Sequence, residues 1–368
     1  MQKRGGGPSE TNSARVQALS LAAPSLAAWF AENARSFPWR EERTPYKVLV
    51  SETMLQQTRI ETVLRYYGRF MAAFPTVRDL AAAPSDLVMK HWEGLGYYSR
   101  ARYLKEAAER CTEEYGGELP ERFDELRKLP GIGDYSAGAI ASLCHDEPVP
   151  AVDGNVLRVL ARFFGDGRDV RLPEVRKEAA EIIREVLGCG EGCAVSPSAF
   201  NEGLMELGET LCAPKGRPQC DSCPLKTACR AHAEGREEEL PYRSADAARS
   251  IEEKTVWVFL CGGRIALEKR PDEGMLRGLY GFPMTEGKLA EDGVEAALAA
   301  RGIAAVNVCP LGTAKHVFTH REWHMTGYLV ETEKCVPGLI YVTAGELADR
   351  YALPSAFRTY RNKLVIDN

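Results

Sequence analysis

Apolar side chains recur every three to four positions between about residue 25 and residue 211, which is the spacing of the buried face of an α-helix. Proline and glycine interrupt this pattern at short intervals, so the sequence predicts many short helices. The first is expected to begin at Ser25, after Pro24, and to end near Arg35. The others are predicted over residues 46–58, 59–72, 76–80, 85–92, 98–115, 121–128, 134–145, 153–164, 173–187 and 198–211.

The pattern changes after residue 253. Residues 256–260 and 265–270 are apolar segments on either side of a Cys-Gly-Gly turn, and residues 322–331 alternate between apolar and polar side chains, as strands do. Helical spacing returns near residues 289–301 and 344–350. The sequence therefore predicts a multi-domain protein, with an all-α domain followed by an α+β domain.

These changes of pattern divide the chain into four parts. Residues 1–24 are expected to be a disordered tail, 25–230 the all-α domain, 231–253 an acidic and solvated interdomain linker, and 254–368 the α+β domain. No run of 18 apolar residues occurs, so no membrane-spanning segment is predicted, and no targeting signal is recognised. We therefore expect a cytoplasmic protein.

The 368-residue chain carries 47 basic and 52 acidic side chains, a formal net charge of −5, which at first argues against a nucleic-acid partner. Residues 231–253 hold 3 basic and 7 acidic side chains and account for most of the deficit. Residues 1–100 hold 13 basic and 9 acidic side chains. The charge is therefore compatible with a local basic face that binds nucleic acid.

Four of the eleven cysteines close the all-α domain: Cys212, Cys220, Cys223 and Cys229. Four thiolates from one short loop suit either a tetrahedral Zn²⁺ or a [4Fe–4S] cluster, and the spacing alone leaves both open, as well as four unpaired thiols. Lys226 and Arg230 lie inside or beside the loop and predict a phosphate clamp. Five further cysteines are expected to be small core residues: Cys111, Cys144, Cys261, Cys309 and Cys335.

Residues 125–137 predict two helices joined by a turn that contains Leu129-Pro-Gly131-Ile-Gly133. Glycines in such a turn leave backbone amides exposed at the start of the second helix, where they can bind an anion. An isolated Gly-x-Gly is more often an ordinary helical turn. The Leu-Pro before it and the small residues after it favour a helix-hairpin-helix that grips a DNA phosphate.

Two carboxylates are candidates for catalysis. Glu52 falls on the apolar face of a predicted helix, where it is either a misplaced surface residue or a buried acid with a raised pKa. Asp153 precedes the helix predicted to end near Phe164, and its spacing alone favours a simple N-cap. Two such carboxylates beside a phosphate-binding hairpin predict cleavage of a glycosidic bond, in which one protonates the leaving group and the other stabilises an oxocarbenium ion.

Taken together, these residues closely resemble the MutY-type adenine DNA glycosylases of the helix-hairpin-helix DNA glycosylase superfamily. The resemblance covers residues 37–230 and, more weakly, the C-terminal domain. The segments that carry it are Pro38-Trp-Arg40, Ser51-Glu-Thr-Met-Leu-Gln-Gln-Thr58, Trp92-Glu-Gly-Leu-Gly-Tyr-Tyr-Ser-Arg100, Leu129-Pro-Gly-Ile-Gly133, Val152-Asp-Gly-Asn155 and the four cysteines.

The resemblance implies that Glu52 protonates adenine and later helps position water, that Asp153 stabilises the sugar cation, and that Tyr135 and Asn155 orient these groups. It implies one [4Fe–4S] cluster at the four cysteines. The first cysteine gap has seven residues where the family usually has six, so we expect a bulge near residues 215–216.

The resemblance also implies a set of residues that contact substrate or DNA. Gln57, Leu95 and Tyr97 match residues that wedge into the base stack or touch the base opposite adenine, and Glu202 matches a polar residue near the active site. Together with the residues of the hairpin, the cysteine loop and the C-terminal domain, the expected contacts are Arg40, Gln57, Thr58, Leu95, Tyr97, Gly131, Gly133, Glu202, Lys226, Arg230, Phe318, Thr319 and His320.

The C-terminal domain resembles the Nudix-like domain with which this family recognises 8-oxoguanine. It lacks the Gly-x5-Glu-x7-Arg-Glu-x2-Glu-Glu pattern, so hydrolysis of pyrophosphates is not expected. Phe318-Thr-His320 matches a Phe-Ser-His loop of the family, and the hydroxyl of Thr319 is expected to accept the N7 hydrogen that distinguishes 8-oxoguanine from guanine. The alternative is a simple turn at the end of a strand.

The residue at position 135 bears on the reaction. Superfamily members that nick the strand carry a lysine there, whereas a tyrosine cannot form an imine, so the sequence predicts a monofunctional glycosylase that leaves an abasic site. The expected substrate is duplex DNA with an 8-oxoguanine:A or G:A mispair, acted on by a monomer associated with the nucleoid of a bacterial-type cell. The alternatives are an endonuclease III-like enzyme for oxidised pyrimidines and a zinc-stabilised DNA-binding module without catalysis.

Overall fold

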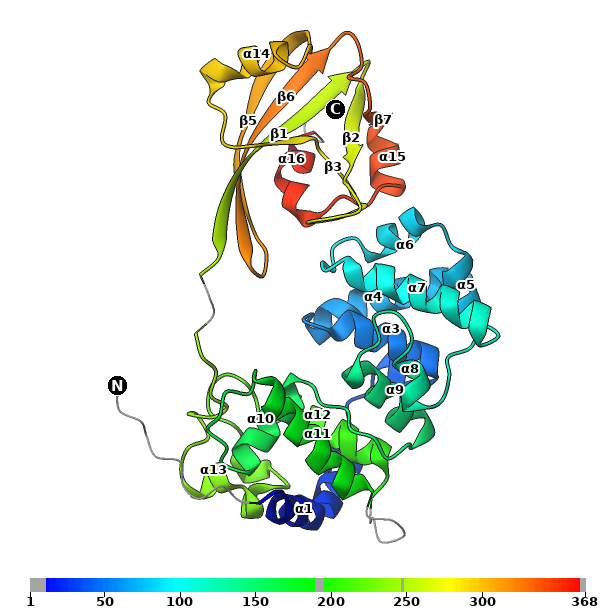
Figure 1. The fold of residues 1–368 in the computed structure, drawn as a ribbon, viewed down its shortest axis with the longest axis vertical. Helices are drawn as coiled ribbons and strands as arrows, with labels where there is room; N and C mark the ends of the chain where they lie inside the picture. The colour runs from blue at the N-terminus through cyan, green and yellow to red at the C-terminus, as the bar shows by residue number, and fades with distance from the viewer. Residues whose placement is uncertain (1–10, 189–194, 246–247, 365–368) are drawn as a thin grey trace. The chain divides into compact units, whose positions relative to one another are not determined.

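A computed structural model describes residues 11–188, 195–245 and 248–364 of the chain (Figure 1). The chain forms two compact units, and each contains segments that are distant in the sequence. The first unit comprises residues 1–57, 76–78 and 106–245. The second comprises residues 58–75, 79–105 and 246–368, so a stretch of the N-terminal helices clusters with the C-terminal domain.

The first unit is helical. Proline occupies the first turn of several of its helices, and Thr44 and Ser196 cap two of them by accepting hydrogen bonds from Lys47 and Ala199. Its helices are α1 (Asn12–Asn33), α2 (Pro38–Glu41), α3 (Pro45–Leu55), α8 (Phe123–Leu126), α9 (Asp134–His145), α10 (Gly154–Phe163), α11 (Pro173–Leu187), α12 (Pro197–Thr210) and α13 (Arg230–Ala233). Helices α5 (Val77–Ala82) and α7 (Ser99–Glu114) each belong partly to both units.

The start of the first helix differs from the prediction. Helix α1 begins at Asn12 rather than at Ser25, and Pro24 lies inside it. Leu19 and Leu26 are fully buried in one core with residues of α10, α11 and α12, so packing offsets the backbone hydrogen bond that the proline removes. The prediction that residues 12–24 belong to a disordered tail is therefore wrong; residues 1–10 lie outside the described part.

The predicted linker is also only partly correct. Ala231 and Leu240 are buried in the first unit, and the guanidinium of Arg162 donates a hydrogen bond to the Leu240 carbonyl at 2.8 Å. The backbone of Tyr242 forms an isolated parallel β-bridge with that of Asp169. The first strand of the sheet starts at Ser250, before the predicted boundary. Residues 231–242 are therefore packed against the first unit and do not form a solvated linker.

The second unit contains helices α4 (Ile60–Ala73) and α6 (Ser85–Trp92) and a mixed sheet in the order β3-β2-β1-β6-β5, with β4 paired to β1 and β7 paired to β2. The strands are β1 (Ser250–Cys261), β2 (Arg264–Lys269), β3 (Tyr280–Gly281), β4 (Met284–Glu286), β5 (Ala305–Val317), β6 (Arg321–Thr332) and β7 (Ile340–Val342). Strands β1 and β6 run parallel from the Ser250–Arg321 pair to the Cys261–Thr332 pair, and the other pairs are antiparallel.

A core lies on each face of this sheet. Helix α14 (Glu291–Ala299) covers one face, and α15 (Ala344–Asp349) and α16 (Arg358–Lys363) cover the other (Figure 1). Because side chains of a strand alternate between faces, Trp257 and Phe259 join the core under α14, whereas Val256 and Val258 join the core with Tyr360 of α16.

Two features of the second unit were not predicted. Strand β5 was missed because most of its side chains are exposed or half-buried, so it shows no apolar alternation. Cys261 is buried, as expected, but it forms a disulfide with Cys335, which is exposed, and Cys309 is half-buried, so the interpretation as small core residues is wrong for Cys335 and Cys309. Within the described ranges, no helix is long and apolar enough to span a bilayer.

Candidate active site and cysteine pocket

Glu52 lies in the interior of the first unit, on α3. Its side chain is only 8% exposed, and the Tyr135 hydroxyl from α9 donates a hydrogen bond to its carboxylate at 2.5 Å. Tyr135 also contacts the sulfur of Met205, on α12, at 3.5 Å. Helix α3 is buried on all sides, and Glu52 is the buried acid rather than a misplaced surface residue.

The surroundings of Glu52 favour its protonated form. Burial is the main cause, and the negative charges of Asp153 and Glu202 add to it, so the pKa of Glu52 rises from 4.5 to about 7. The Tyr135 hydrogen bond and the positive charge of Arg40 oppose this rise. At neutral pH a large fraction of Glu52 carries a proton, which is what a general acid requires.

Asp153 is both an N-cap and a neighbour of Glu52. One of its carboxylate oxygens accepts a hydrogen bond from the Val156 amide at 2.7 Å, which caps α10, and the other accepts one from the Asn155 side chain at 3.0 Å. Burial raises the pKa of Asp153, whereas these hydrogen bonds and the charge of Arg158 lower it. The capping role inferred from spacing is confirmed, and it fixes the carboxylate within electrostatic range of Glu52.

Glu202 and Arg40 belong to a buried ion-pair network beside this pair. Arg40 Nε contacts Glu202 at 3.1 Å and its Nη2 contacts Glu206 at 3.0 Å, and Arg43 contacts Glu202 at 2.7 Å. Arg35 also pairs with Glu206. Glu202 and Arg40, both predicted to contact substrate or DNA, are thus held together next to Glu52.

The predicted hairpin lies between α8 and α9. Gly131 has φ +72°, a conformation that side chains other than glycine rarely adopt, and Gly133 precedes the first residue of α9. Both glycines are exposed, and α9 has no side-chain cap, so the amides at its N-terminus face solvent. This arrangement matches the anion-binding turn that the sequence predicts.

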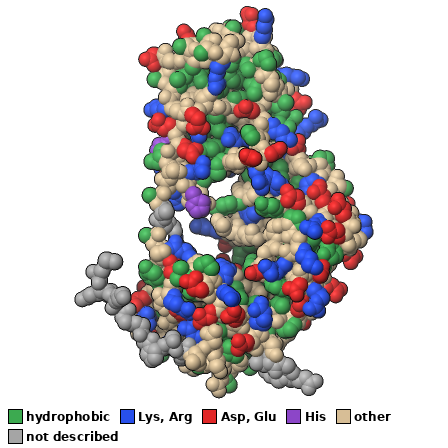
Figure 2. All heavy atoms as spheres, in the orientation of Figure 1, with side chains coloured by type: hydrophobic (Ala, Val, Ile, Leu, Met, Phe, Trp, Pro, Cys, Tyr) green, Lys and Arg blue, Asp and Glu red, His purple; other side chains and the backbone are tan. Residues whose placement is uncertain are grey.

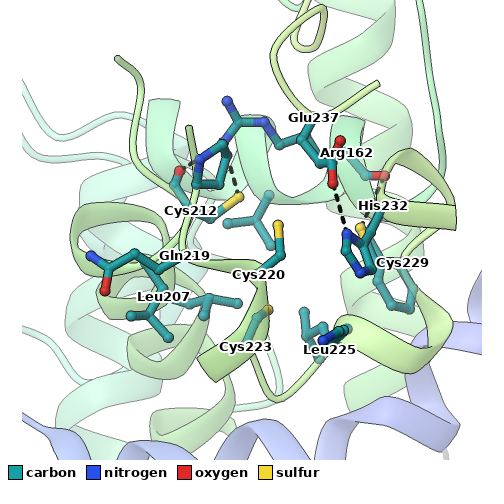
Figure 3. Close-up of a pocket in the computed structure, with 15 residues that line it drawn as sticks. Arg162, Leu207, Cys212, Gln219, Cys220, Cys223, Leu225, Cys229, His232 and Glu237 are labelled. Carbon is teal, nitrogen blue, oxygen red and sulfur yellow. Dashed lines mark hydrogen bonds and ion pairs between the residues drawn. The ribbon is translucent and has the colours of Figure 1, made fainter. Parts of the chain in front are cut away.

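The four predicted cysteine ligands line one pocket of the first unit (Figure 3). Cys220 belongs to a short 3-10 turn, and Cys212 follows α12. Arg162 Nη1 donates a hydrogen bond to the Cys212 sulfur at 3.2 Å. Burial raises the pKa of the Cys223 thiol to about 12, and it also raises the pKa values of Cys220 and Cys229.

This donor set fits a metal centre. Burial disfavours the charged thiolate form of Cys220, Cys223 and Cys229, and a bound metal would compensate the charge of such thiolates. The neighbouring guanidinium of Arg162 contributes in the same direction. The residues therefore fit a cluster held by Cys212, Cys220, Cys223 and Cys229.

The basic residues of the cysteine loop lie on its surface. Lys226 pairs with Asp221 at 2.6 Å and Arg230 with Glu234 at 2.7 Å. The bulge predicted near residues 215–216 corresponds to an exposed turn in which Gly216 has φ +74°. On the face drawn in Figure 2, basic and acidic side chains are interspersed, as the near-balance of charge implies.

In the second unit, the turn before α7 presents Tyr97 to solvent. Tyr97 is 47% exposed, whereas Leu95 is only 6% exposed. Gly94 and Gly96 have φ values of +102° and +72°, so the turn directs Leu95 inward and Tyr97 outward. Of these two expected contacts, Leu95 is therefore buried in this structure and Tyr97 is accessible.

Arg100 holds this turn in place and was not predicted as a site residue. Its Nη2 donates hydrogen bonds to the carbonyls of Leu95 and Gly96, and to the hydroxyl of Thr58, each at 3.2 Å. Its guanidinium also lies 5.4 Å from the centre of the Tyr97 ring. Thr58 thus supports the turn, while Gln57, in the first unit, is exposed.

The Phe318-Thr-His320 segment is the turn between β5 and β6, also in the second unit. Phe318 packs edge-on against Trp323, with ring centres 4.8 Å apart, whereas Thr319 and His320 are exposed. The hydroxyl oxygens of Thr319 and Tyr97 lie 3.3 Å apart. The segment is thus a turn at the end of a strand, as the alternative interpretation stated. The turn also brings together Thr319 and Tyr97, two of the expected contact residues.

Sequence reasoning missed a further arginine that connects the two sites of the first unit. Arg158, on α10, donates hydrogen bonds to the Cys212 carbonyl at 2.8 Å, to the Gly208 carbonyl at 2.7 Å and to the Asn155 side chain at 2.6 Å. An arginine on a helix reads as a surface residue. Arg158 shares the polar stripe of α10 with Asn155 and Arg162, so the sequence pattern gives no sign that it is buried.

Comparisons with known proteins agree with this geometry. The model of the HhH-GPD superfamily base excision DNA repair proteins matches residues 50–185, and that of the NUDIX domain matches residues 255–363. The adenine DNA glycosylase of Homo sapiens is 32% identical over 408 residues, which cover 92% of this chain and 74% of that protein. The Mus musculus enzyme is 31% identical over 404 residues, covering 92% and 77%.

Solved structures support the helical part of the fold. A thermostable thymine-DNA glycosylase has a TM-score of 0.52 and 28% identity, and the match covers 61% of this chain and all of that one. The predicted fold class, an all-α helix-hairpin-helix part with an α+β Nudix-like part, is confirmed. Because its sequence is 32% and 31% identical to those of the human and mouse enzymes over 92% of its length, the chain is a DNA N-glycosylase and belongs to the adenine DNA glycosylase family.

Proposed function

We propose that the chain removes adenine paired with 8-oxoguanine or guanine in duplex DNA, and that it leaves an abasic site without cutting the strand. The observation that carries this proposal is Glu52, a buried carboxyl whose pKa is raised to about 7 and which lies beside Asp153 and Tyr135. A protonated acid next to a second carboxylate suits hydrolysis of an N-glycosidic bond.

In the proposed reaction, Glu52 gives its proton to a ring nitrogen of adenine. The bond between sugar and base then breaks with its electron pair on the base, so adenine leaves as a neutral molecule. Asp153 stabilises the positive charge that develops on the sugar, because its carboxylate is fixed by the amide of Val156 and the side chain of Asn155. The Glu52 carboxylate finally helps position the water that attacks the sugar.

Tyr135 supports a reaction that stops at the abasic site. Its hydroxyl is committed to Glu52, burial raises its pKa well above the usual value, and it carries no amine. A phenol cannot form the imine through which strand-nicking glycosylases act. We therefore assign Tyr135 to the orientation of Glu52.

Two exposed residues with unusual backbones support extrusion of the base. Gln57 has φ +58° and Tyr97 has φ +46°, and each such conformation costs a non-glycine residue about 1–3 kcal/mol. Strain of this kind is concentrated at functional sites. We infer that both side chains enter the base stack. Their contacts there offset the free energy, on the order of a few kcal/mol, that unstacking and unpairing of adenine cost.

The contact between Thr319 and Tyr97 supports recognition of the opposite base. Their hydroxyl oxygens are 3.3 Å apart, and Thr319 lies at an exposed turn. The Thr319 hydroxyl has lone pairs that can accept the N7 hydrogen of 8-oxoguanine, whereas guanine has an acceptor at N7. Replacing residues 318–320 by alanine is expected to remove the preference for 8-oxoguanine:A over G:A; an unchanged preference would exclude this assignment.

A [4Fe–4S] cluster is the metal group that we propose for the cysteine pocket. A single tetrahedral Zn²⁺ needs four sulfurs at about 2.3 Å from the ion, and hence about 4 Å from one another. Among the described residues, the one group of three possible ligands whose donor atoms all lie within 4.8 Å is Cys220, His232 and Glu237, so the four sulfurs are spread more widely. When bound, the cluster would cross-link the loop and hold Lys226 and Arg230, which we assign to phosphate contacts.

A glycosylase assay on paired duplexes tests the proposal. The duplexes differ only in the base opposite adenine, and each reaction is divided into a sample with alkali, which cleaves abasic sites, and one without. We expect strand breaks only after alkali, most with 8-oxoguanine opposite adenine, and none with Glu52→Gln. Breaks without alkali, or adenine release that is independent of the opposite base, would contradict the proposal.

A further inference from the structure

The cysteine pocket contains one more potential metal ligand than a four-cysteine site requires. His232 follows the last cysteine by three residues, on α13, and its ring lies at the pocket beside Cys229 and Cys220 (Figure 3). Glu237 lines the same pocket from the following turn. Neither residue has a part in the reaction proposed above.

Glu237 fixes the imidazole of His232. The Nδ1 atom of His232 lies 2.7 Å from the Glu237 carboxylate, and the two side chains are only 30% and 14% exposed. One ligand atom of each of Cys220, His232 and Glu237 lies within 4.8 Å of the others. Of the four cysteines, Cys220 is the one that belongs to such a group in the described part of the chain.

The pairing of a carboxylate with a histidine has a specific meaning at metal sites. Histidines that bind metals usually donate their other ring N–H to a carboxylate or carbonyl, which fixes the tautomer and the orientation of the ring. In the tautomer in which Nδ1 carries the hydrogen and donates it to Glu237, the other ring nitrogen keeps the lone pair with which an imidazole binds a metal. Iron–sulfur clusters accept such ligands, since histidines replace cysteines at one iron of Rieske centres.

We propose that His232, oriented by Glu237, is a fifth metal-binding residue of the cysteine pocket, and that its imidazole ligates the iron at the Cys220 position when the Cys220 thiolate is not available. One neutral nitrogen then replaces one thiolate, so the cluster and its ligands become less negative by one charge. This inference rests on the proposed [4Fe–4S] cluster.

The test is a double-substitution cycle on the full chain. Cys220→Ala and Cys220→Ala/His232→Ala are purified without oxygen, and iron and sulfide per chain are measured with the visible absorption of the cluster. Cys223→Ala and Cys223→Ala/His232→Ala form the matched control, because Cys223 lines the same pocket but is not grouped with His232. Circular dichroism of each variant reports whether the helical unit is folded.

We expect Cys220→Ala to keep several-fold more iron than Cys220→Ala/His232→Ala, and Cys220→Ala/Glu237→Gln to fall between them. In the Cys223 background, the substitution of His232 is expected to have no effect. The reduction potential of the cluster in Cys220→Ala is expected to rise, because a neutral ligand stabilises the more reduced cluster. Equal iron in the two Cys220 variants, or an equal loss in both backgrounds, would overturn the proposal.

Two further results keep the outcome decisive. If Cys220→Ala does not fold, Cys220→Val, which is close to cysteine in size and has no atom that could bind iron, replaces it in the same pair after reconstitution with Fe²⁺ and sulfide. If the unsubstituted chain itself binds no iron, the proposed cluster fails; if it binds iron normally and the two Cys220 variants do not differ, only the role of His232 fails.

Discussion

Glu52 combines two properties that are opposed in most proteins. Its side chain is buried almost completely, and yet it carries an ionisable group whose partners include two further carboxylates, Asp153 and Glu202. A buried carboxyl of this kind destabilises the fold whenever it ionises. A role as a proton donor would explain why Glu52 is buried despite this cost. Two measurable predictions follow from its raised pKa.

The first prediction concerns the pH dependence of adenine release. The pKa of Glu52 is about 7 and the proposed reaction needs its protonated form, so the rate of the chemical step should fall as pH rises through about 7. Glu202→Gln removes a negative charge that raises this pKa, so the fall should move to lower pH. Single-turnover rates across pH measure both, and Glu113→Gln, on the exposed surface of α7, is the control that should leave the profile unchanged.

The second prediction concerns stability. Between pH 4.5 and about 7 the unfolded chain loses the Glu52 proton while the folded chain retains it, so this residue lowers the free energy of unfolding as pH rises through that window. Glu52→Gln should therefore raise the free energy of unfolding above pH 7, by on the order of 2–3 kcal/mol, and change it little below pH 4.5. Urea unfolding at the two pH values measures the difference, and an equal effect at both would contradict it.

At the scale of single residues, sequence patterns singled out the two neighbouring carboxylates, Glu52 and Asp153, more readily than the residues that hold them. Glu52 stood out because a carboxylate is rare on an apolar helix face. Arg158 and Arg100 are common residue types in helices, and only their tertiary contacts, to Cys212 and to Leu95, reveal that they are buried supports. The inward position of Leu95 depends on the φ angles of its glycine neighbours, which the pattern does not specify.

Helix α10 shows how one element serves both architecture and chemistry. Asp153 caps its N-terminus and accepts a hydrogen bond from Asn155, and the next turns carry Arg158 and Arg162, which donate hydrogen bonds to Cys212. The cap and the proposed catalytic role use different properties of Asp153, namely a hydrogen-bond acceptor and a negative charge. They can therefore be separated by substitution.

The third prediction makes this separation. Asn caps helices as well as Asp does, so Asp153→Asn should change the free energy of unfolding little, whereas Asp153→Ala should lower it by about 1 kcal/mol. Both should abolish adenine release, because neither side chain carries the charge that stabilises the sugar cation. Thermal unfolding and the glycosylase assay on the same preparations measure the two effects; activity in Asp153→Asn would reduce Asp153 to a cap.

The fourth prediction concerns the contact between α10 and α12. A Cβ at Gly208 would lie 2.7 Å from Cβ of Asn155 and 3.1 Å from its backbone oxygen, so Gly208→Ala must displace the residues around Asp153. Gly203, on the same helix, would meet only the flexible side chains of Leu26 and Phe30, with the nearest atom at 3.1 Å. We expect Gly208→Ala to lose most adenine release and Gly203→Ala to keep it; comparable rates would show that α10 tolerates the shift.

At the scale of elements, the spacing of apolar residues predicted the buried helices and strands. It failed for segments whose structure is not reflected in that spacing. The helices from α3 to α12 lie close to the predicted ranges, because apolar residues recur along them and proline or glycine lies near most of their ends. Helix α1 continues through Pro24, since packing of Leu19 and Leu26 outweighs a local rule. Strand β5 is held by pairing to β6 and shows little apolar alternation.

At the scale of the whole molecule, the net charge of −5 requires that DNA binding be local. The candidate contacts are the amides at Gly131 and Gly133 and the basic side chains of the cysteine loop. Phosphate contacts release counterions, so binding should weaken steeply with salt even though the chain is acidic overall.

The fifth prediction measures one of these contacts. Lys226→Gln should reduce the slope of log affinity against log salt by about 0.9, the value for one lost phosphate contact on duplex DNA. Lys177, an exposed lysine of α11 that also faces an acidic partner, provides the matched control, and Lys177→Gln should leave the slope unchanged. Fluorescence anisotropy with a catalytically inactive chain measures both, and equal slopes would remove Lys226 from the DNA contacts.

The division into units was the least predictable feature of the molecule. A linear pattern shows where composition changes, and it correctly marked the start of the sheet to within a few residues. It contains no sign that residues 58–75 and 79–105 cluster with residues 246–368, because that grouping depends on contacts between segments far apart in the chain.

The parallel pairing of β1 with β6 has a consequence for truncated forms of the protein. Strand β1 is made about 70 residues before the strand that it must pair with, and its apolar core residues include Trp257 and Phe259. A chain that terminates prematurely between the two strands would release an unpaired apolar edge of the kind that nucleates aggregation. Premature stop codons in this stretch should therefore yield insoluble protein, rather than a soluble helical part of the chain.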